Sequence, residues 1–207
     1  MESISEKKRE LRKIMKARLL VATESSAVSA SLSAEACNSL MRSEAYTRSD
    51  VVFAYNATST ELNPLPLVEK ALSEGRIVAL PRVKAGTCDM EFYQLSAQRN
   101  LSEQLESGAY GIMEPVKSLP LLEPESLRGK RLLLVTPGLA FTKDGRRLGH
   151  GKGFYDRYIP RLLNSGVNVA SCGFCYDCQI VEDLPCDSLD FRMDKVVTES
   201  HFFESAE

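Results

Sequence analysis

Apolar side chains recur every three or four residues at the start of the chain, which predicts an amphipathic helix over about residues 4–21. Ser3 and Glu6 have the spacing of a capping box, which would begin this helix. A second helix is predicted from about residue 27 to residue 42. Beyond it the pattern changes to short apolar runs, which indicate buried strands.

The rest of the chain alternates strand-like runs with helical segments. Strands are predicted at 50–55, 76–80, 91–95, 131–136, 167–174 and 195–198. Helices are predicted at 64–74 and 154–164. Pro81 is expected to close the second strand, and Pro160 is expected to kink or break the last helix. The segment 96–129 is interpreted mostly as loop and short helix, and 137–153 as a long loop.

This alternation predicts one α/β domain over residues 1–207, including the N-terminal helix. The expected architecture is a mainly parallel sheet flanked by helices, a Rossmann-like three-layer arrangement. The run 131–136 is the most apolar, so it is expected to be the central strand. Ligands of such sheets bind at the carboxyl ends of the strands.

Composition narrows the class of protein. With 207 residues, 43% hydrophobic and 26% charged, the chain has the values of a globular protein. No apolar run approaches the roughly 18 residues of a membrane span. The net charge of −2 favours neither nucleic acid nor an anionic membrane, so we expect neither as a partner. The charged N-terminus lacks an export signal, which favours a cytoplasmic location, and we expect a monomer.

Three cysteines form a C-x2-C-x2-C motif at 172, 175 and 178, the spacing of some iron–sulfur ligands. Cys172 lies in a predicted strand, where residues three apart point to opposite faces. We therefore interpret the motif as structural thiols. A metal or cluster site and a cysteine nucleophile remain alternatives.

The loop after the predicted central strand carries the candidate chemistry. Gly149, Gly151 and Gly153 alternate within it, so its backbone can approach a ligand closely. Arg146, Arg147 and Lys152 add positive charge, and a helix is predicted to begin directly afterwards. Glycines, cations and a helix N-terminus together favour a phosphate site. The motif is not a Walker A loop, and a merely flexible loop remains an alternative.

The N-terminal helix has one strongly basic face. Lys8 and Arg12 are one turn apart on it and could approach a phosphate together. The alternative interpretation is a solvated surface.

The glycine-rich loop and several other segments of the chain resemble the motifs of one protein family. The segment Arg147-Leu148-Gly149-His150-Gly151-Lys152-Gly153-Phe154-Tyr155-Asp156, preceded by residues 137–141, resembles the 5-formyltetrahydrofolate cyclo-ligase family, also called methenyltetrahydrofolate synthetases. Residues 8–12, Glu61, the segment 110–115 and the segment 189–194 resemble further family motifs in matching order. His150 departs from the pattern, since many members have arginine there.

The resemblance implies ATP- and Mg²⁺-dependent cyclisation of 5-formyltetrahydrofolate to 5,10-methenyltetrahydrofolate, with phosphorylation of the formyl oxygen and release of ADP and phosphate. It implies that Lys152 and Arg147 act in catalysis, that Asp156 and Asp190 hold Mg²⁺, and that Glu61 and Tyr155 bind folate. The residues expected to contact the nucleotide are Lys8, Arg12, Arg147, Leu148, Gly149, His150, Gly151, Lys152, Gly153, Phe154 and Tyr155.

Two other classes of protein stay open. One is a different α/β enzyme, acting on a sugar phosphate or transferring an acyl group, which would bind phosphate without needing ATP. The other is a non-catalytic relative that binds folate or a nucleotide.

Overall fold

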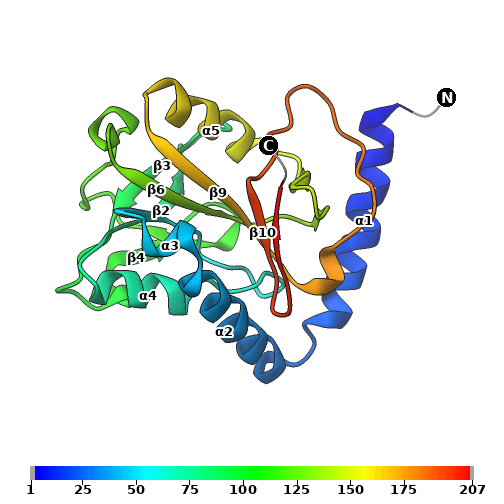
Figure 1. Ribbon diagram of the computed structural model, residues 1–207, viewed down its shortest axis with the longest axis horizontal. Coiled ribbons are helices and arrows are strands. Elements are labelled where there is room, and N and C mark those ends of the chain that lie inside the picture. Colours follow the sequence, from blue (N-terminus) through cyan, green and yellow to red (C-terminus); the bar gives the residue numbers. More distant parts are fainter. Residues whose placement is uncertain (1–2, 206–207) are drawn as a thin grey trace.

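A computed structural model describes residues 3–205 of the chain and contains one large sheet (Figure 1). Its strands are β1 (Val51–Phe53), β2 (Ile77–Val83), β3 (Met90–Gln94), β6 (Arg131–Thr136), β9 (Asn168–Phe174), β10 (Lys195–Val197) and β11 (Phe202–Glu204). Across the sheet their order is β11-β10-β9-β6-β1-β2-β3. The inner strands run parallel, and the edge strands β3 and β11 are antiparallel to their neighbours. The predicted mainly parallel sheet is confirmed.

Helices cover both faces of this sheet. The α-helices are α1 (Ile4–Ala22), α2 (Ser26–Arg42), α3 (Glu44–Thr47), α4 (Leu65–Ser73) and α5 (Phe154–Asn164). Leu133 of β6 belongs to one core cluster with residues of α1, α2 and α4, whereas Leu134 belongs to a second cluster with residues of α5. Neighbouring residues of a strand point to opposite faces. The helices therefore form two layers around the sheet, as predicted.

Strand β6 lies in the middle of the sheet and spans the residues predicted for it. All of its residues after Arg131 are buried. It pairs in parallel with β1 on one side and with β9 on the other. Its carboxyl end therefore opens at the edge of the sheet where the loops after β1 and β9 also begin.

Helix α1 begins as the sequence predicts. The hydroxyl of Ser3 accepts a hydrogen bond from the backbone N–H of Glu6, and the carboxylate of Glu6 accepts one from the backbone N–H of Ser3. This reciprocal capping box satisfies two backbone donors that the helix itself leaves unpaired. Helix α5 also has its predicted bounds, and it continues through Pro160 without a break.

The predicted end of β2 is wrong, because the strand continues through Pro81 to Val83. Its pairing with β1 reaches only Ala79, whereas its pairing with β3 continues to Val83. Pro81 therefore lies where β2 has a ladder on one side only. A proline is tolerated there because its missing N–H can face away from the ladder.

The shortest elements were not predicted. Within 96–129 lie the 3₁₀ helices η1 (Leu101–Gln104), η2 (Ala109–Gly111) and η3 (Pro124–Leu127), and a two-stranded ribbon of β4 (Leu105–Ser107) and β5 (Met113–Pro115). Within 137–153 lies a hairpin of β7 (Ala140–Phe141) and β8 (Arg147–Leu148). The helices α3 and η4 (Asp177–Gln179) and the strand β11 were also not predicted. Two- and three-residue strands are too short to show an alternating pattern.

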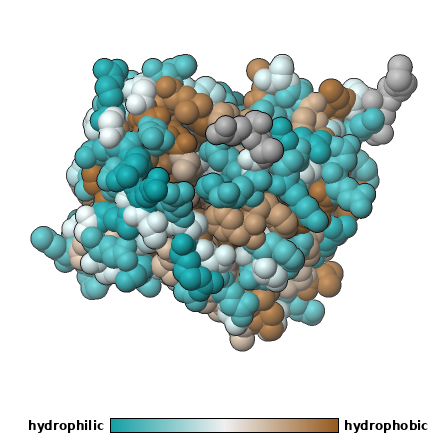
Figure 2. Space-filling model, in the orientation of Figure 1, coloured by the Kyte–Doolittle hydropathy of each residue, from teal (hydrophilic) through white to brown (hydrophobic). Residues whose placement is uncertain are grey.

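Polar side chains cover much of the face drawn in Figure 2, and apolar ones gather at its upper left, near its centre and at its lower right, where α1 ends and α2 begins. Leu20 and Val21 at the end of α1 and Val28 in the first turn of α2 are exposed apolar residues. In the part of the chain from residue 3 to residue 205, no helix combines the length and apolar character needed to cross a membrane.

The packing of β6 predicts a large effect of Leu133→Ala on stability. Leu133 is fully buried in the central strand, so its truncation should lower the free energy of unfolding by about 2–5 kcal/mol. The same substitution at Leu20, which is 65% exposed on α1, should change it by less than about 0.5 kcal/mol. Urea unfolding of both variants measures the difference, and equal losses would contradict the assignment of β6 to the core.

Candidate active site

The loop from residue 137 to residue 153 leaves the carboxyl end of β6 and folds back as the β7–β8 hairpin. Gly145 closes the turn of this hairpin with a positive φ of 91°. Its carbonyl accepts a hydrogen bond from the backbone N–H of Met193 at 2.8 Å. The hairpin is thereby tied to the segment 182–194, which leads to β10.

The glycine-rich part of the loop lies directly before α5. Gly151 and Gly153 have φ values of 101° and 67°, which residues with a side chain rarely adopt. Gly153 is the N-cap of α5, so the unpaired N–H groups of the first helical turn point toward the loop. The predicted combination of alternating glycines and a helix N-terminus is present. Such an arrangement favours an anion.

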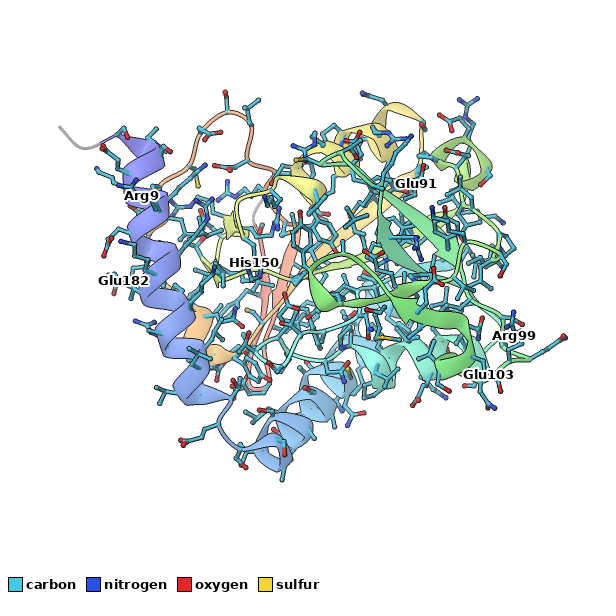
Figure 3. The ribbon with its side chains drawn as sticks, turned by 180° about the vertical axis from the view of Figure 1, so that it is seen from behind. Arg9, Glu91, Arg99, Glu103, His150 and Glu182 are labelled. Atoms are coloured by element: carbon cyan, nitrogen blue, oxygen red, sulfur yellow. The ribbon has the colours of Figure 1, made fainter. Side chains whose placement is uncertain are left out.

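Helix α1 lies against this loop, and Lys8 and Arg12 both face the domain. Arg12 Nε donates a 2.9 Å hydrogen bond to the carbonyl of Gly149. Lys8 Nζ lies 2.7 Å from a carboxylate oxygen of Asp187 and 2.6 Å from one of Asp190. Most other cations of α1 are exposed (Arg9 is labelled in Figure 3). The structure therefore separates two inward cations from a solvated face.

Arg147 is buried rather than open to a ligand. Its side chain is 4% exposed, and its Nη2 donates to Asp156 Oδ1 at 2.7 Å. Its Nη1 donates to the carbonyl of Pro137, and its Nε is buried without a hydrogen-bond partner among residues 3–205. This guanidinium connects the loop to α5 and orients Asp156.

The two predicted metal ligands lie on adjoining segments. Asp156 Oδ1 accepts the bond from Arg147 and a long one of 3.5 Å from the backbone N–H of Phe191, the residue after Asp190. Asp190 Oδ2 accepts the bond from Lys8. Within the described chain the second oxygen of each carboxylate has no hydrogen bond to protein. No group of three or more His, Cys, Asp or Glu side chains suited to a metal occurs between residues 3 and 205.

Such a pair fits Mg²⁺ better than a metal that needs a full protein cage. Mg²⁺ is often held by one or two carboxylates together with phosphate oxygens and waters. Asp156 and Asp190 would supply those carboxylates.

Glu61 lies beside the glycine-rich loop. Its carboxylate accepts hydrogen bonds from the backbone N–H and the hydroxyl of Thr58, at 2.9 and 3.0 Å. Its other oxygen is 3.3 Å from Nε2 of His150 (Figure 3 labels His150 between α1 and the sheet). The side chain of Glu61 is 9% exposed. The residue predicted to bind substrate is therefore held in one orientation next to the loop.

Tyr155 is largely a core residue. Its ring belongs to the second core cluster, and the guanidinium of Arg147 lies 5.4 Å from its centre. Burial is the main cause that raises the pKa of its hydroxyl above the ordinary value. This position leaves little of the ring free to stack on a ligand. Leu148, also predicted at the nucleotide site, is buried in the first cluster.

A cavity of about 680 Å³ opens beside Lys152. Its walls come from the turn between β2 and β3, the β4–β5 ribbon and Lys152 itself. Tyr110 is 65% exposed and lines it with a φ of 59°, which is unusual for a tyrosine. Its ring is 5.9 Å from Lys152 Nζ and edge-on to Phe154.

Tyr110 is not among the site residues that the sequence predicts. It belongs to the segment 110–115, which resembles a family motif. The signal that could have found it is an aromatic residue beside Gly111 in a motif of a predicted loop, where its side chain is free to meet a ligand.

Two of the three cysteines of the C-x2-C-x2-C motif, Cys172 and Cys175, lie in the core, and Cys178 is partly buried. Cys172 and Cys175 belong to opposite core clusters, as the strand alternation predicts. Burial raises the pKa of Cys172 to about 12 and that of Cys37 to about 11, so both stay protonated thiols at neutral pH. These cysteines fill space in the core.

Comparison with known proteins agrees with these features. The model of the 5-formyltetrahydrofolate cyclo-ligase family matches residues 4–199. The chain belongs to this family. A probable 5-formyltetrahydrofolate cyclo-ligase of Schizosaccharomyces pombe is 32% identical over 158 residues, which cover 72% of this chain and 74% of that protein. The 5-formyltetrahydrofolate cyclo-ligase of Escherichia coli K12 is 33% identical over 146 residues, covering 70% and 75%.

A solved structure shares the whole fold. The 5,10-methenyltetrahydrofolate synthetase of Aquifex aeolicus superposes with a TM-score of 0.77 at 30% identity, covering 97% of this chain and 93% of that one. The resemblance stated from the sequence motifs is thereby confirmed, and so is the predicted enzyme class, a cyclo-ligase.

The contact between His150 and Glu61 predicts that His150→Arg is tolerated. Arginine is charged at every physiological pH and would turn this 3.3 Å contact into a permanent ion pair. Turnover should stay within roughly threefold of the wild type, a change below about 1 kcal/mol, and the Michaelis constant for ATP should not rise. Steady-state kinetics test this. Loss of turnover with unchanged nucleotide binding would instead assign His150 an acid–base role.

Proposed function

We propose that this enzyme closes the ring of 5-formyltetrahydrofolate to give 5,10-methenyltetrahydrofolate, with ATP converted to ADP and phosphate. The observation that carries the proposal is the placement of Lys152. Its ammonium faces Tyr110 at the cavity, while its backbone lies between Gly151 and Gly153 at the N-terminus of α5. One residue therefore adjoins both a cavity for a ring system and a cradle for phosphate.

The cavity beside Lys152 suits the folate. Its volume of about 680 Å³ is within the range of small-molecule sites. The exposed ring of Tyr110 offers a flat apolar surface for an aromatic ligand. Glu61 does not line this cavity but lies beside the glycine-rich loop at His150, where its fixed carboxylate can accept hydrogen bonds from N–H groups of the pterin. Tyr155, which we predicted to bind folate, would then support the site from the core.

The glycine-rich loop suits the phosphates of ATP. Free N–H groups of the loop and of the first turn of α5 attract negative charge, and Lys8 and Arg12 of α1 border the same region. Mg²⁺, held by Asp156 and Asp190, would offset part of the triphosphate charge. Arg147 acts on this region through Asp156, because its own guanidinium is buried.

The chemistry follows from the need to activate an unreactive formyl group. The formyl oxygen attacks the γ-phosphorus, and the bond to ADP breaks. The second folate nitrogen then attacks the formyl carbon and gives up its proton as the ring closes. The carbon–oxygen bond breaks, and the phosphate leaves with this proton as hydrogen phosphate. Lys152 stabilises negative charge on the phosphoryl group during its transfer. Glu61 and Tyr110 hold the folate so that its reacting atoms meet.

The single domain over residues 1–207, the monomeric state and the cytoplasmic location remain predictions. We still expect neither nucleic acid nor a membrane as a partner.

The purified chain should convert 5-formyltetrahydrofolate to 5,10-methenyltetrahydrofolate only when Mg²⁺ and ATP are both present. The product is followed by its absorbance, and ADP and phosphate should appear in equal amounts. Omission of ATP and chelation of Mg²⁺ are the controls. Turnover without ATP would favour a different α/β enzyme, and ligand binding without turnover would favour a non-catalytic relative.

Lys152→Ala should reduce kcat/KM by roughly one hundred- to a thousandfold, because one charge-assisted contact to the transferring phosphoryl group supplies about 2.7–4 kcal/mol. The fold should survive, since the side chain is exposed. Lys117→Ala removes the same charge at an exposed position outside the cavity and serves as the matched control. Equal turnover of the two variants would remove Lys152 from the mechanism.

A further inference from the structure

The segment 182–194 runs alongside α1, as the orange strap beside the blue helix in Figure 1 shows. It contributes both carboxylates that contact Lys8, one from Asp187 and one from Asp190. The sequence did not predict Asp187 as a site residue. Its contacts connect it to Lys8 and Asp190, which the sequence did predict.

Lys8 is nearly buried between these carboxylates, with a side chain 10% exposed. An ammonium group has three N–H donors, and two of them serve Asp187 Oδ2 and Asp190 Oδ2. A lysine side chain is charged at neutral pH, and within the described residues Lys8 has one donor left for a further acceptor.

Asp187 also organises the segment around itself. Its Oδ1 accepts a 2.9 Å hydrogen bond from the backbone N–H of Leu189, which forms an Asx turn. Its own backbone N–H donates a 2.8 Å bond to Asp190 Oδ2. That oxygen of Asp190 thus receives donors from both Lys8 and Asp187. The other oxygen of Asp190 accepts no hydrogen bond from residues 3–205.

We propose that Asp187 is a positioning residue, which holds Lys8 and Asp190 at the nucleotide site without touching the nucleotide itself. This inference rests on the function proposed above, because it takes the phosphates as the acceptor of the third Lys8 donor. The alternative is that Asp187 competes with phosphate for Lys8. The two roles predict opposite effects on ATP binding when the carboxylate is removed.

Asp187→Asn separates these roles. Asparagine keeps an oxygen that can accept from Leu189 and keeps the backbone N–H that reaches Asp190, so the turn should survive. The negative charge opposite Lys8 is lost, together with the hydrogen bond that Asp187 Oδ2 accepts from Lys8, because the amide nitrogen that replaces this oxygen cannot accept. Titration calorimetry with Mg·ATP should show binding weakened about five- to twentyfold, the usual size for a lost charge-assisted hydrogen bond. The Michaelis constant for ATP should rise similarly, while that for 5-formyltetrahydrofolate stays unchanged.

A double-mutant cycle with Lys8→Ala then tests whether Asp187 acts through Lys8. In the Lys8→Ala background, Asp187→Asn should change ATP binding by less than about twofold. Glu182→Gln is the matched control, because it removes one negative charge from an exposed position in the same segment. It should leave ATP binding at the wild-type value.

Three results would overturn the proposal. The first is equal or tighter ATP binding by Asp187→Asn in the wild-type background. The second is a loss of equal size with and without Lys8, which would mean that Asp187 acts independently. The third is unchanged ATP binding by Lys8→Ala, which would overturn the assignment of Lys8 as well. None of them bears on the proposed reaction, which stands or falls with product formation by the unmodified enzyme.

Discussion

The parallel pairing of β6 with β1 and β9 is the constraint on which the candidate site depends. Phe53 of β1 lies opposite Leu134 of β6, so the two strands end at the same edge of the sheet. The loop after β1 carries Glu61, and the loop after β6 carries the alternating glycines. Their meeting, seen in the 3.3 Å contact between Glu61 and His150, is a consequence of that register. The central position and register of β6 therefore determine where the candidate site lies.

The second requirement is the docking of α1, which brings the beginning of the chain to this edge. Arg12 bonds to a residue 137 positions later, and Lys8 to one 179 positions later. Met15 and Leu19 bury the apolar stripe of the helix in the first core cluster. The apolar contacts hold the helix against the domain, and the polar contacts determine which of its cations face inward. Lys8, Arg12, Met15 and Leu19 follow one another at spacings of three or four residues, so the inward cations and the apolar stripe share one face of the helix.

Local patterns predicted what local physics determines. The capping box of α1, the bounds of α5 and the residues of β6 follow from side-chain spacing, and all three are observed. The glycine-rich motif likewise predicted a tightly bent backbone directly before a helix, and Gly151 and Gly153 have positive φ values at the start of α5. Burial could not be predicted from the motif in the same way. Arg147 and Tyr155 belong to it, but tertiary packing places both in the interior.

The features that sequence reasoning missed depend on contacts between distant segments. Strand β11 is a strand because it pairs with β10 at the edge of the sheet, and the β7–β8 hairpin consists of two-residue strands. Tyr110 lies beside Lys152 only because the β4–β5 ribbon brings it there. The positioning role proposed for Asp187 depends on its contact with Lys8, which is 179 positions away in the sequence. The spacing of residues along the chain does not show which distant residues come into contact.

The balance of charge at the site limits how a nucleotide can be bound. Among the charged side chains named for the candidate site, four are positive (Lys8, Arg12, Arg147 and Lys152) and four are negative (Glu61, Asp156, Asp187 and Asp190). These eight charges sum to zero, so together they exert little long-range attraction on a triphosphate. Under the proposed function, binding would come instead from short-range donors already held in place, the loop N–H groups and the remaining N–H of Lys8. The carboxylates that neutralise the cations also orient them, so removing one changes both the local charge and the geometry.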